Sequence, residues 1–465
     1  MDRFRFIHAA DIHLGSMLHI DGAEEGGPAD HCRKAVYKAF EKLCRKAVEH
    51  QARFILISGD LYDRESRNVY ANRLFVDMCR MLDEKGIDVY VAAGNHDPLR
   101  ENQELFAPTP NVHICRADSP SVFEVEDKGR VIARVIGQSY DTQWIRKPIY
   151  RSFDLPGDGV FNIAMLHTQL EAGGNYIPST ASDLMKVPNI HYWALGHIHR
   201  PEIINEDKPV IAYPGTTQGR DFGEEDPGGC YLVEVDGTEI ISMKRLITSS
   251  VLFRSVHIDI SSAELNAAET IDDLETYMIS MAGSIAQGFD GPEADGMADS
   301  AGPLMPGVYT GLNEPDDLKE IEGYAVRWVI TGRGSLNRAL KSLGEGDEAD
   351  ITQSLRRRLD NLRPFVWTDS IVIRTGSPLT DQALAEHKTL LELLERSAAE
   401  LLTDEGKARQ LKSELGLVWQ GSGDHEETDE ERLYNRLFLD DETLRSIIQD
   451  ARQLILENIP EKAGD

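Results

Sequence analysis

The sequence predicts an α/β fold in which helices cover a buried sheet, and three observations predict it. Short apolar runs typical of buried strands recur through the first two hundred residues. Helical patterns with one apolar face lie between some of them. Hydrophobic residues make up 41% of the 465 residues, so the chain can build a sizeable core and is expected to hold two to three domains.

Five apolar runs, bounded by Gly, Asp or Pro, are the predicted strands of this sheet. They are residues 4–7, 54–57, 89–91, 161–165 and 192–195. A short polar motif follows each of them. In sheets covered on both faces, polar residues collect in the crevice beyond the carboxyl ends of the strands. The five strands are therefore expected to deliver their motifs to one place.

The five motifs contain residue types that bind metals. They are Asp11-Ile12-His13, Gly59-Asp60, Gly94-Asn95-His96-Asp97, Leu166-His167-Thr168 and Gly196-His197-Ile198-His199. The two-residue spacing within the first and the last motif puts both side chains on the same side of an extended chain. Imidazole and carboxylate suit manganese, iron or zinc, and the absence of a Cys pair argues against a closed structural zinc site.

The charge of this ligand set suits the cleavage of phosphate esters by two metal ions. An aspartate can bridge two metals roughly 3.5–4 Å apart, the spacing used for in-line displacement at phosphorus. Two divalent cations outweigh the two carboxylates of Asp11 and Asp60, and Asn95 adds an oxygen ligand without charge. The surplus positive charge can attract a phosphodiester. His96 is placed to protonate a leaving oxygen, because imidazole works near neutral pH.

Together the motifs resemble the calcineurin-like metallophosphoesterase superfamily, and within it the SbcD-type DNA repair exonucleases with their bacterial YhaO-like branch. The narrower resemblance depends on Leu14-Gly15, Leu61-Tyr62-Asp63, Thr168 and Tyr213-Pro214-Gly215. It is dense over residues 1–235. The resemblance implies a two-sheet core, which is a β-sandwich flanked by helices, followed by a small α+β capping domain and a helical C-terminal tail.

The resemblance also implies a role for each site residue. The first metal would be held by Asp11, His13, Asp60 and His199, and the second by Asp60, Asn95, His167 and His197. Asp60 would bridge two divalent ions, most simply Mn²⁺, and His96 would be the general acid. The implied substrate contacts are Arg200, Tyr213, Thr216 and Arg220. Thr216 stands where the family often has Ser, and it keeps the hydroxyl.

Structural interpretations of the same residues are simpler. A lone His-x-His is more often a satisfied core pair than a ligand pair, and Gly-Asn-His-Asp alone is more often a turn. Asp63 and Asp97 are expected to brace neighbouring loops. The occurrence of all five motifs in order after strands favours the metal site. A degraded, non-catalytic relative is the stronger alternative, but every ligand position is present.

The net charge of −30 is unusual for an enzyme that acts on DNA, because phosphate contacts normally dominate nucleic-acid affinity. Residues 1–250 hold 28 Lys and Arg against 37 Asp and Glu, a net charge of −9, so most of the acidic excess lies beyond them. The loops around the motifs carry Arg64, Arg67, Arg100, Arg146, Lys147, Arg151, Arg200 and Arg220. The chain alone is expected to bind DNA weakly, and a partner is expected to supply part of the binding.

The remaining elements follow from periodicity and turn signals. Helices are expected at 29–50 and 67–85 and a hairpin at 230–247 that turns at Asp236-Gly237. Strands at 251–260, 324–331 and 365–374 alternate with helices at 263–281 and 351–362. Residues 283–323 are rich in Gly, Pro, Ala and acid, and are expected to form a mobile insertion.

Three domains are expected from this pattern. Residues 1–250 form the nuclease domain, residues 251–378 the capping domain, and residues 379–465 a helical region. The apolar stripes of the last region have two interpretations that are about equal. Its helices either pack on the body of the protein or dock on the coiled coil of an ATPase of the structural-maintenance type.

The function expected from the sequence is a manganese-dependent DNA exonuclease that works in DNA repair with such an ATPase, and a homodimer is a further expected assembly. The alternatives are a phosphoesterase for a small nucleotide or a phosphoprotein, and a non-catalytic member of an ATPase complex. No apolar stretch is long enough to span a bilayer, so no membrane association is expected. The absence of a signal peptide and the five cysteines without metal-type spacing point to the cytoplasm.

Overall fold

The computed structural model describes most of the chain up to residue 376. The described ranges are residues 3–22, 27–63, 66–100, 106–170, 175–287, 308–309, 320–344 and 346–376, with scattered positions between 389 and 451. Most of the predicted helical region 379–465 and most of the predicted insertion 283–323 therefore lie outside the described residues.

A seven-stranded sheet carries the first three predicted strands. Its order is β14-β12-β11-β1-β2-β3-β4, and β1 to β4 run parallel. The strands are β1 (Arg3–Ala9), β2 (Phe54–Ser58), β3 (Asp88–Ala92), β4 (Val112–Ile114), β11 (Gly229–Asp236), β12 (Glu239–Ile247) and β14 (Val308–Tyr309). The hairpin predicted at 230–247 is β11–β12, which confirms it.

A six-stranded sheet carries the other two predicted strands. Its order is β5-β6-β7-β8-β10-β9, and β6, β7, β8 and β10 run parallel. The strands are β5 (Ser121–Asp127), β6 (Arg130–Gly137), β7 (Phe161–His167), β8 (Tyr192–Gly196), β9 (Glu202–Asn205) and β10 (Val210–Tyr213). The sequence-based prediction omitted four of these strands, β5, β6, β9 and β10.

The two sheets pack face to face around a shared aromatic core. The ring of Phe6 on β1 stacks on that of Phe54 at 5.1 Å and meets Tyr192 on β8 edge-on at 5.4 Å. His8 also joins the sheets, since its Nδ1 accepts from the Tyr192 hydroxyl at 2.9 Å and its Nε2 donates to the Leu195 carbonyl at 3.0 Å. Burial lowers the pKa of His8 to about 3, so this bridge is neutral.

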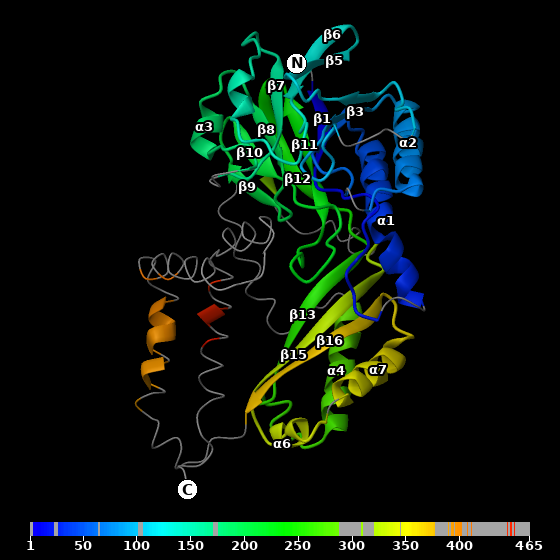
Figure 1. The fold of residues 1–465 in the computed structure, drawn as a ribbon, viewed down its shortest axis with the longest axis vertical. Helices are drawn as coiled ribbons and strands as arrows, with labels where there is room; N and C mark the ends of the chain where they lie inside the picture. The colour runs from blue at the N-terminus through cyan, green and yellow to red at the C-terminus, as the bar shows by residue number, and fades with distance from the viewer. Residues whose placement is uncertain are drawn as a thin grey trace. The chain divides into compact units, whose positions relative to one another are not determined.

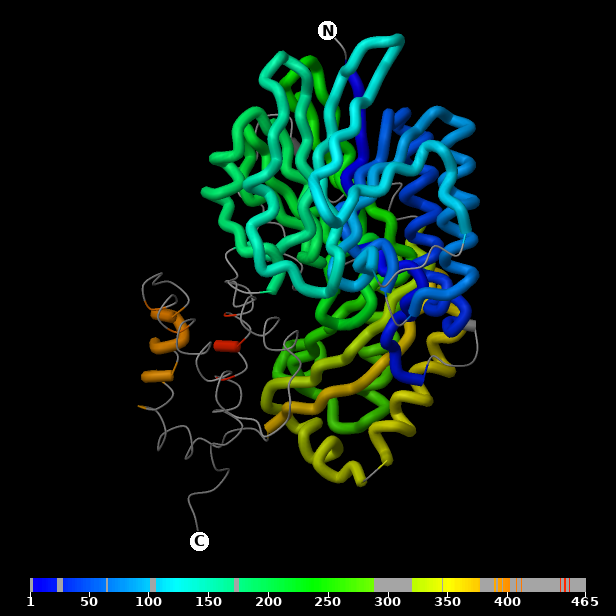
Figure 2. Tube along the Cα trace, turned by 45° about the horizontal axis from the view of Figure 1, so that its top comes forward, coloured from blue at the N-terminus to red at the C-terminus, as the bar shows by residue number. Residues whose placement is uncertain are grey.

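Helices cover the outer faces of this sandwich. α1 (Gly27–Glu49) and α2 (Val69–Asp83) lie on the seven-stranded sheet, and the short α3 (Ala181–Met185) lies beside the six-stranded one (Figure 1). The turned view shows the same separation (Figure 2). A second apolar cluster, with Phe40, Leu43 and Phe75 from the helices, packs under α1 and α2. These layers confirm the predicted α/β class with a two-sheet core and the helices predicted at 29–50 and 67–85.

Contacts divide the chain into two compact units. The first comprises Met1–Arg254, Ala282–Val326 and Leu359–Asp369, and the second Ser255–Met281, Arg327–Arg358 and Ser370–Asp465. A three-stranded sheet of order β13-β15-β16 is formed by β13 (Val251–Asp259), β15 (Gly323–Arg333) and β16 (Phe365–Gly376). Between β13 and β16 the chain forms the helices α4 (Ile271–Ala286), α6 (Asn337–Lys341) and α7 (Asp347–Leu359). The predicted domain bounds at 250 and 378 stay predictions.

The helix predicted from residue 263 begins only at Ile271. Thr270 and Asp273 cap each other, because the Asp273 amide donates to Thr270 Oγ1 at 3.2 Å and the Thr270 amide donates to Asp273 Oδ2 at 3.0 Å. Such a reciprocal pair fixes the first turn of a helix, and the residues before it form turns. No helix among the described residues is long and apolar enough to cross a membrane.

Candidate metal centre

Four of the predicted ligands sit on left-handed backbone at the ends of their strands. The φ angles are 50° at Asp11, 48° at His13, 51° at Asp60 and 98° at His197. Non-glycine residues rarely adopt this region, at a cost of about 1–3 kcal/mol each, and such strain clusters at functional sites. The turns point the four side chains back across the carboxyl edge of the sandwich.

Three glycines allow the strand ends to approach one another. A Cβ atom on Gly59 would lie 2.0 Å from His167 Nδ1, one on Gly94 2.1 Å from Asp60 Oδ1, and one on Gly196 1.9 Å from the Ser58 carbonyl oxygen. No side chain fits at these distances, so the glycines before Asp60, Asn95 and His197 are needed for packing.

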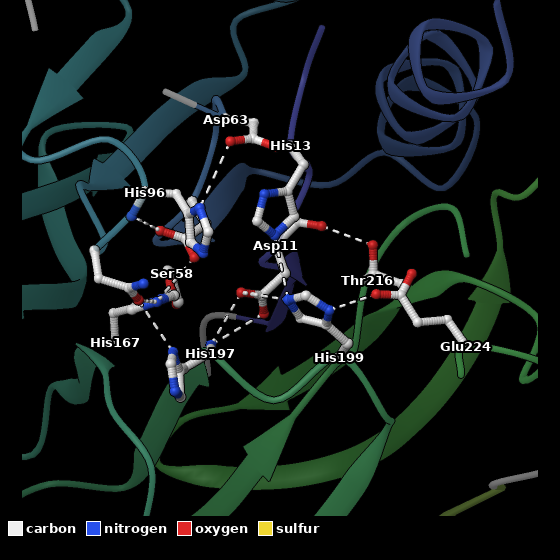
Figure 3. Close-up of polar contacts among 12 residues, drawn as sticks. Asp11, His13, Ser58, Asp63, His96, His167, His197, His199, Thr216 and Glu224 are labelled. Carbon is white, nitrogen blue, oxygen red and sulfur yellow. Dashed lines mark hydrogen bonds and ion pairs between the residues drawn. The ribbon is translucent and has the colours of Figure 1, made fainter. Parts of the chain in front are cut away.

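One group of ligands gathers at the ends of β1 and β8. His13 Nε2 lies 3.2 Å from His199 Nε2, and His199 Nε2 lies 3.9 Å from Asp11 Oδ1 (Figure 3). Asp11 also accepts the His197 amide with both carboxylate oxygens at 3.1 Å, which ties the end of β1 to the end of β8. Asp11, His13 and His199 thus form one cluster of candidate ligands.

A second group gathers at the ends of β2, β3, β7 and β8. His167 Nε2 lies 2.8 Å from Asn95 Oδ1 and 3.2 Å from Asp60 Oδ2. His197 Nδ1 lies 3.1 Å from the same Asn95 oxygen. Asp60, His167 and His197 form the second cluster of candidate ligands, with Asn95 adjoining it. Figure 3 shows His167 and His197 close to each other.

The residues present fit two metal ions. Ligands bound about 2.1 Å from a shared ion lie about 3–3.5 Å apart. His13 Nε2 lies 3.2 Å from His199 Nε2, and His167 Nε2 lies 3.2 Å from Asp60 Oδ2, whereas Asp11 Oδ1 is somewhat farther, 3.9 Å from His199 Nε2. Two imidazole nitrogens that face each other at 3.2 Å also favour a shared cation over a simple hydrogen bond.

Burial and opposite charges set the ionisation of these groups. Burial raises the pKa of Asp11 to about 6 even though His167 and His199 lower it. For His167, burial lowers the pKa, but the Asp60 carboxylate more than offsets this and the pKa rises to about 9. Burial likewise raises the pKa of Asp60, yet His167 and His96 bring it well below its usual value. Asp60 therefore remains a carboxylate in this group.

His96, the predicted general acid, lies beside these groups but is not buried. Its side chain is 31% exposed, and its Nδ1 lies 3.6 Å from Asp63 Oδ1. Its backbone amide donates to Asp60 Oδ1 at 2.9 Å. The hydrogen bond from His96 lowers the pKa of Asp63, so a carboxylate faces the ring.

Asp63 and Asp97 take the bracing positions expected of them. Asp97 accepts the Gly94 amide at 2.6 Å and the Tyr62 amide at 3.2 Å, which joins the loops after β2 and β3. Asp63 accepts the Ser16 hydroxyl at 2.9 Å. Asp63 also contacts the His96 ring, since its Oδ1 lies 3.6 Å from His96 Nδ1.

The predicted substrate-binding residues take different positions. Tyr213 is buried and its hydroxyl donates to the Thr168 carbonyl at 2.9 Å, while Thr216 is buried and donates to the Asp11 carbonyl at 2.8 Å. Arg220 is 17% exposed and Arg200 40% exposed, the latter 3.4 Å from Asp226. The first two thus frame the site, and substrate contact by all four stays a prediction.

Glu224 is a site residue that the sequence reasoning missed. Its Oε1 accepts from His199 Nδ1 at 2.6 Å and from Arg220 Nη2 at 3.2 Å, and its Oε2 accepts the Arg220 amide at 2.8 Å (Figure 3). Burial raises the pKa of Glu224, but His199 and Arg220 more than offset this and keep it charged. No signal marked this position, because Glu224, Glu225 and Asp226 form one acidic run after the Tyr-Pro-Gly motif.

Comparison with known proteins identifies the domain that carries this site. Residues 4–201 match the Calcineurin-like phosphoesterase family. The chain is 32% identical over 262 residues to the uncharacterized metallophosphoesterase YhaO of Bacillus subtilis strain 168. The aligned region covers 56% of this chain and 64% of YhaO.

Two further relatives carry names that mention DNA or a nuclease. The DNA double-strand break repair protein Mre11 of Methanocaldococcus jannaschii is 27% identical over 248 residues, covering 50% of this chain and 63% of that protein. The SbcD component of the SbcCD nuclease of Bacillus subtilis strain 168 is 25% identical over 260 residues, covering 47% and 63%. The chain thus spans less than two thirds of the length of these three relatives.

Proposed function

Residues 4–201 are a calcineurin-like metallophosphoesterase domain, and on that premise we propose that the protein is a two-metal phosphodiesterase that degrades DNA from its ends. The observation that carries the proposal is the convergence of two nitrogen and oxygen ligand groups at one edge of the sandwich, with His96 beside them. The bound ions, which we take to be Mn²⁺, would supply Lewis-acid charge for a phosphodiester.

The chain's own residues would hold the two ions. Asp11, His13 and His199 would hold one ion, Asn95, His167 and His197 the other, with Asp60 shared between them. Hydrogen bonds select the nitrogen that each ring offers. His167 Nδ1 donates to the Ser58 carbonyl at 2.9 Å and His199 Nδ1 donates to Glu224, so both rings present Nε2.

His96 would donate the proton to the leaving oxygen. Because its Nδ1 faces the Asp63 carboxylate, the proton to be transferred is on Nε2. The partial exposure of the ring allows a substrate to reach that atom, whereas the metal ligands are mostly buried.

DNA as the substrate, DNA repair as the setting and an ATPase partner are the finer parts of the proposal. The support for them is the names of Mre11 and of the SbcCD nuclease. These names describe those proteins and not this chain. Only scattered positions of the predicted ATPase-docking region 379–465 lie within the described residues.

The test is hydrolysis of DNA by the purified chain with Mn²⁺. We expect nucleotide release from linear duplex DNA and none from the same sequence as a closed circle. Equal cleavage of both would contradict action from an end. Hydrolysis of a cyclic nucleotide or a phosphopeptide without release from DNA would favour the small-substrate alternative, and two bound metals without any hydrolysis would favour the regulatory one.

A further inference from the structure

Residues 142–153 form a basic and aromatic segment in a chain whose net charge is −30. The segment contains no Asp or Glu, although Asp141 and Asp154 flank it. Its aromatic residues are Trp144, Tyr150 and Phe153, and its cations are Arg146, Lys147 and Arg151. None of them takes part in the metal binding or proton transfer proposed for the centre.

Two tilted aromatic contacts connect Trp144 of this segment to the metal centre. The ring of Tyr176 lies 4.6 Å from that of His197 at an interplanar angle of 36°, and the ring of Trp144 lies 5.6 Å from that of Tyr176 at 43°. All three belong to the first compact unit. Tyr176 is buried and Trp144 is half-buried, so the stack leads from a predicted ligand to a partly exposed indole.

Backbone contacts hold Trp144 in place at one end of the segment. The Ile145 amide donates to the Asn175 carbonyl at 2.8 Å, and the Ile177 amide donates to the Ile145 carbonyl at 2.7 Å. Arg146 Nε donates to Asn175 Oδ1 at 2.8 Å. These bonds fix the residues on both sides of the stacked pair, so the indole needs little ordering when a ligand arrives.

Buried aromatic rings anchor the other end. Tyr150 lies within the 3₁₀ turn Ile149–Ser152 and Phe153 follows it, and both are buried. The ring of Phe153 packs parallel to that of Trp193 on β8 at 6.0 Å. Because β8 leads directly into His197, the segment and the metal centre are fixed to the same strand.

The cations of the segment face the solvent. Arg146, Lys147 and Arg151 are exposed, and within the described residues none of them forms an ion pair with a carboxylate. Most other loop cations around the site have one, such as Arg220 with Glu224 and Arg200 with Asp226. The charges of the segment are therefore available to an anionic ligand.

We propose that residues 142–153 bind the DNA strand that enters the metal centre, with Trp144 stacking on an unpaired base and Lys147 and Arg151 contacting its phosphates. Aromatic platforms next to basic groups bind single strands in this way, because every base has a free π face once it is unpaired. The ligand is thus a single-stranded end and not an intact duplex. This inference rests on the proposed DNA substrate and adds where and in which form the strand is bound.

The test measures binding without cleavage. Anisotropy of a fluorescein-labelled oligothymidylate is followed with the full chain in EDTA, over a range of salt concentrations. Trp144→Leu, which keeps apolar packing but removes the π face, should weaken binding about 5- to 100-fold, the loss expected for one stacking contact. Trp144→Phe should restore most of the affinity. A duplex of the same length with blunt ends should bind less tightly than the single strand.

The charge contacts are tested in the same assay with a matched control. Lys147→Ala should reduce the slope of log affinity against log salt by about 0.7, the share of one phosphate contact to a single strand. Lys128→Ala removes an equally exposed lysine from the β5–β6 turn and should leave slope and affinity as in the wild type.

Two results would separate the possible failures. If the wild-type chain binds the oligonucleotide and both Trp144→Leu and Lys147→Ala bind it equally well, the segment is not the binding site, while the proposed nuclease function stands. If the wild-type chain binds no single strand even at low salt, the proposed DNA substrate itself is contradicted.

Discussion

At the scale of single residues, the partner of each imidazole decides what the metal centre can do. His167 is held by a neutral carbonyl of Ser58, whereas His199 is held by the Glu224 carboxylate. A carboxylate partner both orients a ligand ring and raises its basicity. The two metal positions are therefore expected to differ in affinity and to respond differently to changes around them.

Removal of Glu224 should weaken one metal site and spare the other. We expect Glu224→Ala to lower the affinity for one Mn²⁺ about 10- to 100-fold, the usual effect of losing such a partner, with the second unchanged. Calorimetric titration of the metal-free protein gives both affinities. Glu225→Ala changes the same charge one residue along and should bind as the wild type. Equal affinity in Glu224→Ala would mean that Arg220 and the loop hold His199 without it.

Asp60 should be needed at both positions. It lies 3.2 Å from His167 through one oxygen and accepts the His96 amide with the other, so it connects the second group to the general acid. Asp60→Ala should abolish turnover and reduce metal occupancy at both sites. Elemental analysis and a phosphodiesterase assay check this, with Asp77→Ala as the control, since Asp77 on α2 is half-buried and pairs with Arg80. More than roughly a hundredth of the wild-type rate would argue against a bridging role.

His96 should matter for chemistry and not for metal binding. Its ring is partly exposed and faces Asp63, and neither of the two ligand groups assigned above contains it, although it could form a further group with His13 and Asp63. His96→Ala should keep both metals and lose about 10²–10⁴-fold in rate on DNA, whose leaving oxygen needs a proton. Hydrolysis of bis-p-nitrophenyl phosphate needs little protonation and should suffer much less. Equal losses on the two substrates, or the loss of a metal, would place the acid elsewhere.

At the scale of elements, the strands and their motifs were predictable, and the connections were not. β1, β2, β3, β7 and β8 are buried along most of their length, so continuous apolar runs mark them. β5 alternates exposed and buried residues, and β9 is half-buried with a polar start. Their apolar signal is weak because they lie at sheet edges. The sequence reasoning missed Glu224 for a related reason, because only the folded chain brings its loop to His199.

Gly59, Gly94 and Gly196 also act at the scale of elements, because they let strand ends meet. Gly94→Ala would place a methyl group 2.1 Å from Asp60 Oδ1. The carboxylate must move, so we expect the loss of at least one metal and about 1–3 kcal/mol of stability from overpacking. Gly283→Ala in α4 is the control, as nothing lies within 4 Å of its Cβ position, and helix propensity favours alanine there. Chemical denaturation and metal analysis of both variants test this.

At the scale of the whole molecule, most of the acidic excess lies outside residues 1–250, which carry the metal centre. The net charge of −30 opposes the approach of DNA, and residues 1–250 carry only −9 of it. Residues 142–153 carry exposed cations, and their Trp144 contacts the ring of Tyr176, which lies next to His197. The sequence composition alone predicted weak binding and did not point to residues 142–153, because the contacts of Trp144 with Tyr176 and of Tyr176 with His197 join three distant segments.

Metal binding should also stabilise the unit that carries the site, since that unit stores strain and buried charge at the centre. Asp11, His13, Asp60 and His197 adopt left-handed backbone, and ions that bind only the folded state offset its cost. At a Mn²⁺ concentration about 100 times the dissociation constant, each site should add about 2.7 kcal/mol. Calorimetry should therefore show an unfolding midpoint that rises with Mn²⁺ and falls in EDTA. Asp60→Ala should show little of this rise. An unchanged midpoint in the wild type would mean that the ligand groups do not hold metal in the folded protein.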